Sequence, residues 1–148
     1  MQKVPWIRIE RVARWALGLA FVAAGLLKAI DPMGFALSIA RMQILPKGAI
    51  GPATIVLPWI EVVGGAALLA LPPFRPAALA ILATLLVGFT AALAVVLARG
   101  TMTHCGCFGV EGGVLGRPDV AFARNLVLGA LAVLLATSSR RSGPVSPP

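Results

Sequence analysis

Four long apolar runs dominate the sequence, and segments rich in proline, glycine and charge separate them. The runs cover residues 12–30, 53–71, 77–98 and 120–137. Each is close to the roughly 20 residues with which an α-helix crosses the hydrocarbon core of a bilayer. Only helices and closed barrels can span lipid, and none of these runs shows the alternation of barrel strands. The pattern therefore predicts an all-α protein, a bundle of four transmembrane helices.

The composition supports a membrane protein. The chain has 148 residues, of which 59% are hydrophobic and 12% charged, with a mean hydropathy of +0.94. That charged share is about half of the usual globular value. We expect one membrane domain over residues 1–137 and a disordered tail rich in Ser, Pro and Arg over 138–148. The basic N-terminus imitates a signal peptide, but its apolar run continues to Asp31, which favours an uncleaved first helix.

The net charge of +8 raises the question of a nucleic-acid partner. The basic residues are scattered at the ends of the apolar runs, as is typical of membrane proteins. Aromatic residues make up 6% of the chain, and it contains no tyrosine, so a base-stacking surface is not expected. The sequence therefore predicts contact with membrane lipid and no nucleic-acid partner.

The distribution of Lys and Arg gives a predicted orientation. If both termini are cytoplasmic, seven basic residues lie inside and six outside, and the N-terminal cluster tips the balance because the first helix usually dominates. The prediction is a multi-pass protein of the plasma (inner) membrane, with the segment 104–109 outside the cytoplasm. The inside set is Lys3, Arg8, Arg11, Arg14, Arg75, Arg140 and Arg141; the outside set is Lys28, Arg41, Lys47, Arg99, Arg117 and Arg124.

Small residues recur at every fourth position in two of the runs, and such faces let helices approach closely in lipid. The abundance of alanine explains the same pattern equally well. The two faces are Ala16, Ala20 and Ala24 in the first run, and Ala80, Thr84, Gly88 and Ala92 in the third.

The segment between the third and fourth runs contains both cysteines and the one histidine, as His104-Cys105-Gly106-Cys107. A disulfide between Cys105 and Cys107 is strained and hence easy to exchange, and Gly106 relaxes the backbone between them. The basic residues His104, Arg99 and Arg117 would favour the reactive thiolate if they fold nearby.

Two other interpretations of the cysteine pair stay open. The thiols could form a structural disulfide or remain inert. They could also bind a metal together with His104. Zinc sites normally need four ligands at wider spacing, and the chain has no further Cys or His, so no metal site is predicted.

A carboxylate, Glu61, lies in the middle of the second run. A charge at membrane depth costs a few kcal/mol and is usually paired or functional. Lys28 and Arg124 are the candidate partners. A structural ion pair that locks two helices and a proton or ligand site are equally compatible with these residues. The neighbouring Trp59 is too deep for an interfacial anchor, so we expect it in the core.

Several short motifs together resemble the methylamine-utilisation protein MauE family, within the wider DoxX-like membrane proteins. The resemblance covers about residues 11 to 137, and the Cys-Gly-Cys-Phe-Gly block is its specific part. His104 stands where the family more often has an acidic residue. The motifs are Gly25-Leu26-Leu27-Lys28 with Asp31-Pro32, Leu45-Pro46, Leu57-Pro58-Trp59-Ile60-Glu61 with Gly64, Gly88-Phe89, Arg99-Gly100, Cys105-Gly106-Cys107-Phe108-Gly109 and Arg124-Asn125.

The resemblance implies a four-helix membrane bundle that acts with a thioredoxin-like partner in maturation of the disulfide-rich small subunit of methylamine dehydrogenase. Our leading hypothesis is a membrane thiol–disulfide oxidoreductase, in which Cys105 and Cys107 exchange electrons with an extracytoplasmic thioredoxin-like protein and help to oxidise a client enzyme. Quinone in the bilayer is the candidate electron acceptor, although the sequence shows no defined site for it. The alternatives are a non-enzymatic assembly factor with a structural Cys pair, and a small-molecule or proton site around Glu61 and Lys28.

Overall fold

The computed structural model describes residues 3–100 and 117–141, all of its regular elements being helical. Four of the helices are long and apolar enough to cross a membrane, as the sequence predicted. The cysteines and His104 lie outside the described residues. The elements are α1 (Lys3–Ile30), α2 (Pro32–Met42), α3 (Lys47–Ala70), the short 3₁₀ turn η1 (Pro72–Phe74), α4 (Arg75–Ala98) and α5 (Pro118–Arg141).

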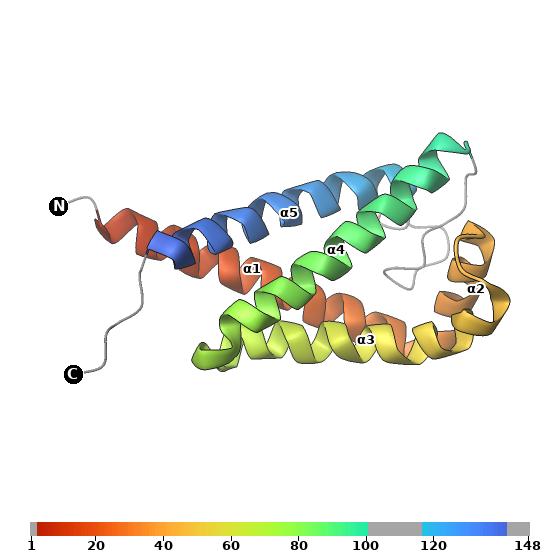
Figure 1. Ribbon diagram of the computed structural model, residues 1–148, viewed down its shortest axis with the longest axis horizontal. Helices are drawn as coiled ribbons and strands as arrows, with labels where there is room; N and C mark the ends of the chain where they lie inside the picture. Colours follow the sequence, from red (N-terminus) through yellow and green to blue (C-terminus); the bar gives the residue numbers. More distant parts are fainter. Residues whose placement is uncertain (1–2, 101–116, 142–148) are drawn as a thin grey trace.

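The four long helices form an antiparallel bundle. Neighbouring pairs around the bundle are α1–α3, α3–α4, α4–α5 and α5–α1. Figure 1 shows the start of α1, the turn between α3 and α4 and the end of α5 at one end of the molecule, and α2 at the other. The end of α4 and the start of α5 lie near α2, where Leu93 and Ala121 pack with Met42 and Phe122. The end of α4 and the start of α5 are therefore both at the α2 end of the bundle.

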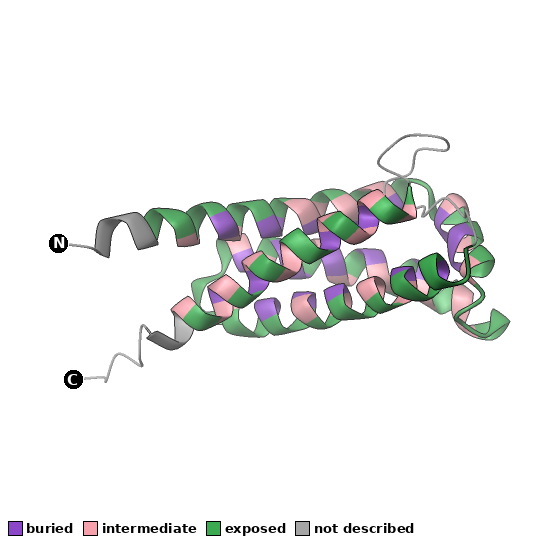
Figure 2. Cartoon of the chain, turned by 90° about the horizontal axis from the view of Figure 1, so that it is seen from above, coloured by how far each residue is buried: buried purple, intermediate pink, exposed green. Residues whose placement is uncertain are grey.

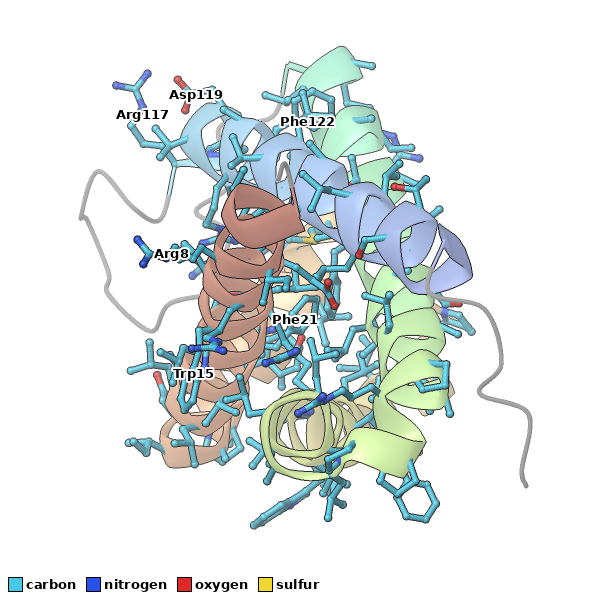
Figure 3. The ribbon with its side chains drawn as sticks, turned by 90° about the vertical axis from the view of Figure 1, so that its left-hand side faces the viewer. Arg8, Trp15, Phe21, Arg117, Asp119 and Phe122 are labelled. Atoms are coloured by element: carbon cyan, nitrogen blue, oxygen red, sulfur yellow. The ribbon has the colours of Figure 1, made fainter. Side chains whose placement is uncertain are left out.

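Buried residues lie mainly on the sides of the helices that face one another, and exposed residues lie on their outer sides (Figure 2). Phe21 of α1 points into the centre, whereas Trp15 and Arg8 of the same helix point away from it (Figure 3). Each long helix contributes to the main apolar core, which consists of Ala13, Leu17, Phe21, Leu68, Ala78, Leu79, Leu82, Leu86, Ala132 and Leu135.

The outer surface of the bundle is apolar. Large hydrophobic side chains such as Val12, Val63, Val87 and Val133 are more than 60% exposed. A contiguous surface of this kind would promote aggregation in water, but it is the expected surface of a helix that faces lipid. The prediction that Trp59 lies in the core is wrong, because its side chain is 58% exposed on the outside of α3.

Glycines let α1 and α3 approach each other closely. A β-carbon at Gly65 would lie 2.7 Å from the carbonyl oxygen of Gly18, which is too close for any side chain. The predicted face of α4 behaves differently: Ala80, Thr84 and Gly88 are exposed, and Gly88 has open space beside it. Helix α3 packs against the side of α1 that carries Gly18. The side of α4 that carries Ala80, Thr84 and Gly88 faces outwards instead.

A helix that the apolar pattern did not indicate, α2, follows α1 directly. Asp31 caps it, because the carboxylate oxygen Oδ1 accepts a hydrogen bond of 2.9 Å from the backbone N–H of Gly34. Pro32 occupies the first helical position, where a missing N–H is harmless. Helix α2 ends at Gln43, whose backbone has the left-handed conformation with φ of 50°.

Two predicted boundaries differ from the structure. Helix α3 begins at Lys47, although the segment from Pro46 to Pro52 was expected to separate helices. Pro52 lies near the start of α3, where its missing N–H removes a single hydrogen bond. Helix α5 continues to Arg141, so residues 138–141 are helical and do not belong to the predicted disordered tail.

Candidate functional site

Lys28 of α1 and Glu61 of α3 form an ion pair inside the bundle. The Lys28 ammonium donates hydrogen bonds to both carboxylate oxygens of Glu61, at 2.6 Å and 2.7 Å. Lys28 is 2% exposed and Glu61 is 1% exposed. Charges at this depth are tolerated only when they are paired, so each residue requires the other. Of the two partners predicted for Glu61, the structure therefore selects Lys28 for the direct contact.

The two charges meet because α1 and α3 approach closely one turn before Lys28. A β-carbon at Gly25 would lie 2.6 Å from the carbonyl oxygen of Pro58 and 3.0 Å from the Glu61 β-carbon. Without a side chain at Gly25, the helix axes come near enough for Lys28 to reach across. Pro58 is itself buried in this contact.

Two aromatic rings complete the surroundings of the Lys28 ammonium. Its nitrogen lies 4.6 Å from the centre of the Phe89 ring and 5.4 Å from the centre of the Phe35 ring. A cation within about 6 Å of an aromatic face is attracted by the ring quadrupole, and more strongly when it is desolvated. Phe89 comes from α4 and Phe35 from α2, so four helical segments converge on this ammonium and carboxylate.

A small cavity of about 30 Å³ adjoins the pair. Arg124 and Asn125 of α5 line it together with Lys28 and Glu61. Asn125 is 5% exposed, and its amide oxygen accepts a hydrogen bond of 3.4 Å from Arg124. The site thus holds two cationic groups and one anionic group. Its volume suits one or two water molecules and not an organic substrate.

The residues at the site can hold water or a proton, but they do not form a metal site. Both oxygens of Glu61 are already taken by Lys28. Within residues 3–100 and 117–141, no cluster of three His, Cys, Asp or Glu side chains is found. Hard cations would need several oxygen ligands, which this arrangement lacks.

The structure places the basic residues on either side of the cysteine segment. Arg99 follows α4, and its guanidinium donates a hydrogen bond of 3.3 Å to the Met42 carbonyl at the end of α2. Arg117 precedes α5 and forms an exposed ion pair of 2.8 Å with Asp119. Cys105, Cys107, His104 and Gly106 lie outside the described residues, so their predicted roles stay predictions.

Sequence reasoning missed the aromatic part of this site. Phe35 and Phe89 carry no sequence signal that separates a ring over a cation from an ordinary core phenylalanine. Asn125 was noted only as part of a motif, although a buried amide in an apolar helix is itself unusual. Its position beside Arg124, directly before the apolar stretch that begins at Leu126, is the signal that could have identified it.

Four spanning helices packed around a buried ion pair define a multi-pass helical membrane protein with a polar site inside the bundle. The chain belongs to the family of the methylamine utilisation protein MauE, whose family profile matches residues 1–138.

A relative of known name is the methylamine utilization protein MauE of Paracoccus denitrificans. It is 38% identical over 145 residues, an alignment that covers 93% of this chain and 76% of the relative. No solved structure matches the chain.

Proposed function

We propose that this protein is an accessory protein of the plasma membrane that helps to form disulfides in an extracytoplasmic enzyme. We place this role in methylamine utilisation, as the name of the relative from Paracoccus denitrificans suggests. Cys105 and Cys107 are the reactive pair, a thioredoxin-like protein is the exchange partner, and a dehydrogenase subunit is the client.

The observation that carries the proposal is the position of the cysteine pair along the chain. Both cysteines fall between the end of α4 at Ala98 and the start of α5 at Pro118, so they lie between two spans and not within one. In this proposal a soluble partner approaches them from one side of the membrane. A pair buried among the spans would be inaccessible to such a partner.

The orientation of the bundle is supported by the surroundings of its basic residues. Lys28 is buried in the ion pair, and Arg124 lines the cavity, so neither belongs to a loop. When Lys28 and Arg124 are left out of the count, four basic residues remain at the α2 end of the bundle. The end that holds the N-terminus has seven. A larger excess of Lys and Arg at the N-terminal end favours a cytoplasmic location for it. The α2 end then faces the oxidising compartment, where disulfides persist.

The chemistry of the proposal is thiol–disulfide exchange. A client or partner thiolate attacks the Cys105–Cys107 disulfide, one sulfur leaves as a thiolate, and a mixed disulfide forms. A second thiolate of the same partner then resolves it. Two electrons and two protons pass from the partner dithiol to the cysteine pair, which must be reoxidised before the next cycle.

The test is to trap the mixed disulfide. Cys105→Ser and Cys107→Ser are expressed separately with the thioredoxin-like partner, and thiols are alkylated in acid before electrophoresis. One of the two variants should accumulate a mixed disulfide that reductant removes. The control is the double Cys→Ser variant, which should trap nothing and should not support client oxidation. If neither single variant traps a partner and the double variant still matures the client, the assembly-factor function replaces this one.

The alternative of a proton or ligand role for Glu61 is less favoured by the geometry. Lys28 occupies both carboxylate oxygens, and the adjoining cavity is too small for an organic ligand. A structural ion pair that fixes α1 against α3 explains these contacts. Glu61→Gln with intact cysteines separates the two roles, because a structural pair affects stability before it affects activity.

A further inference from the structure

Helices α4 and α5 form a long groove on the outside of the bundle. It has a volume of about 890 Å³ and opens on the outer surface of the bundle. Small residues make it deep, because they leave space between the two helices. These are Ala80, Ala83, Ala91 and Ala94 of α4, and Gly129 and Ala132 of α5.

The groove reaches the polar cavity at one place. Leu86 and Asn125 line both spaces, so they form the wall between the groove and the Lys28–Glu61 pair. The other polar side chain in the groove is Thr90, whose hydroxyl already donates to the Leu86 carbonyl at 2.6 Å. The Asn125 amide oxygen accepts from Arg124, which makes its amide NH₂ the donor at this wall.

A second groove on the bundle provides a comparison. It lies between α3 and α4, has a volume of about 680 Å³, and is lined by apolar residues together with the indole of Trp59. Its lining contains no amide or charged side chain, and it shares no residue with the polar cavity. Ordinary acyl chains suffice to fill such a groove. The α4–α5 groove differs because the amide of the buried Asn125 lies at its wall, and the cationic groups of Lys28 and Arg124 lie behind that wall.

The depth of Asn125 restricts the kind of molecule that fits. Asn125 lies seven residues after the start of α5 at Pro118, which is about 10 Å along the helix. A phospholipid headgroup is charged and stays at the interface, and an acyl chain has no acceptor to offer. An isoprenoid quinone has a long apolar tail and an uncharged ring whose carbonyl oxygens accept hydrogen bonds.

We propose that the α4–α5 groove binds an isoprenoid quinone, with a ring carbonyl hydrogen-bonded to Asn125 and the tail along the alanine-lined part of the groove. The positive charges of Lys28 and Arg124 behind this wall exceed the single negative charge of Glu61. They favour electron density on the ring oxygen that faces them.

The role of the quinone, but not its binding site, rests on the proposed function. In that role the quinone is the oxidant of the reduced cysteine pair. The dithiol gives up two electrons and two protons and becomes a disulfide, and the quinone takes up both and becomes a quinol.

Photo-crosslinking with an azido-ubiquinone in lipid nanodiscs tests the binding site. The probe should label peptides of α4 and α5, and decylubiquinone should compete. Ala91→Leu fills the groove at an exposed position, and Asn125→Leu removes the donor. Each should weaken labelling about tenfold, the effect of one lost hydrogen bond or a blocked contact. Ala77→Leu is the matched control in the α3–α4 groove and should label like the wild type.

Equal labelling of the Ala91→Leu, Asn125→Leu and Ala77→Leu proteins would overturn the proposal. So would equal competition by decylbenzene, which has the chain without the carbonyls. The double Cys→Ser protein should still be labelled. Client oxidation that persists in the double Cys→Ser protein, with labelling intact, therefore counts against the proposed function alone. Absent labelling of the wild type, with client oxidation that still depends on the two cysteines, counts against the quinone site alone.

Discussion

Gly25 of α1 lies directly against the main-chain carbonyl of Pro58 of α3, and this contact sets how closely the two helices pack. A β-carbon at Gly25 would come within 2.6 Å of the Pro58 oxygen, a distance that real β-carbons do not show. The obstacle is backbone, which cannot rotate away as a side chain could. Lys28 reaches Glu61 from the next turn of α1, so the ion pair depends on this close packing.

We expect Gly25→Ala to destabilise the protein by about 1–3 kcal/mol, as other overpacked contacts do. The helices must separate, which also lengthens the Lys28–Glu61 contact. Unfolding in mixed micelles, followed by circular dichroism, measures the change. Gly88→Ala is the matched control, because a β-carbon there meets nothing within 4 Å. It should be neutral or slightly stabilising, since alanine is the better helix former. Equal losses for both variants would show that the Gly25 contact does not limit the packing.

Glu61→Gln should lower stability by roughly 0.5–2 kcal/mol, in line with the modest polar couplings measured in membranes. The substitution leaves the Lys28 charge buried without its counter-ion. The double variant Lys28→Met with Glu61→Leu should recover part of the loss, because it removes both charges together. Thermal unfolding in nanodiscs is the measurement.

The control for Glu61 is Asp119→Asn, which breaks an ion pair of similar length that is exposed on both sides. Solvent screens that pair, so no measurable change is expected. If Glu61→Gln leaves stability unchanged and abolishes client maturation, Glu61 acts on a proton or ligand and the structural interpretation fails.

Asp31→Ala should loosen the first turn of α2. The side chain of Asp31 satisfies the Gly34 backbone N–H, and loss of such a cap costs about 1 kcal/mol. Hydrogen exchange of α2 amides should accelerate severalfold, while exchange in α3 stays as it was. Asp31→Ser keeps a capping oxygen and should exchange like the wild type. Unchanged α2 protection in Asp31→Ala would mean that packing, and not the cap, holds this helix.

Topology reporters should report one side of the membrane after Lys47 and after Gly113, and the other side after Arg75. Lys47 begins α3 near α2, and Gly113 lies in the sequence between the end of α4 and the start of α5, which are both at that end of the bundle. Arg75 begins α4 at the opposite end. With the proposed orientation, Lys47 and Gly113 are extracytoplasmic. A cytoplasmic signal after Gly113 would remove the oxidising compartment from the proposed function.

The sequence by itself determined the four spans, because burial in lipid requires about 20 apolar residues and that requirement is local to each segment. It did not indicate α2, which is too short to span and depends on the Asp31 cap and on contact with α3. It misplaced Trp59, because the depth of a residue in the bilayer does not tell which way its side chain faces. In lipid an outward apolar side chain costs nothing, so composition cannot separate the two faces of a helix.

The candidate site shows the same division. The rarity of charge in an apolar helix was enough to predict that Glu61 is paired, and to name Lys28 and Arg124 as its partners. The choice of Lys28, the rings of Phe35 and Phe89, and the position of Asn125 between cavity and groove were decided by tertiary structure. Each of these depends on the rotation and spacing of neighbouring helices, which the Gly25–Pro58 and Gly18–Gly65 contacts set. Such contacts join residues far apart in the chain, so no local pattern in the sequence encodes them.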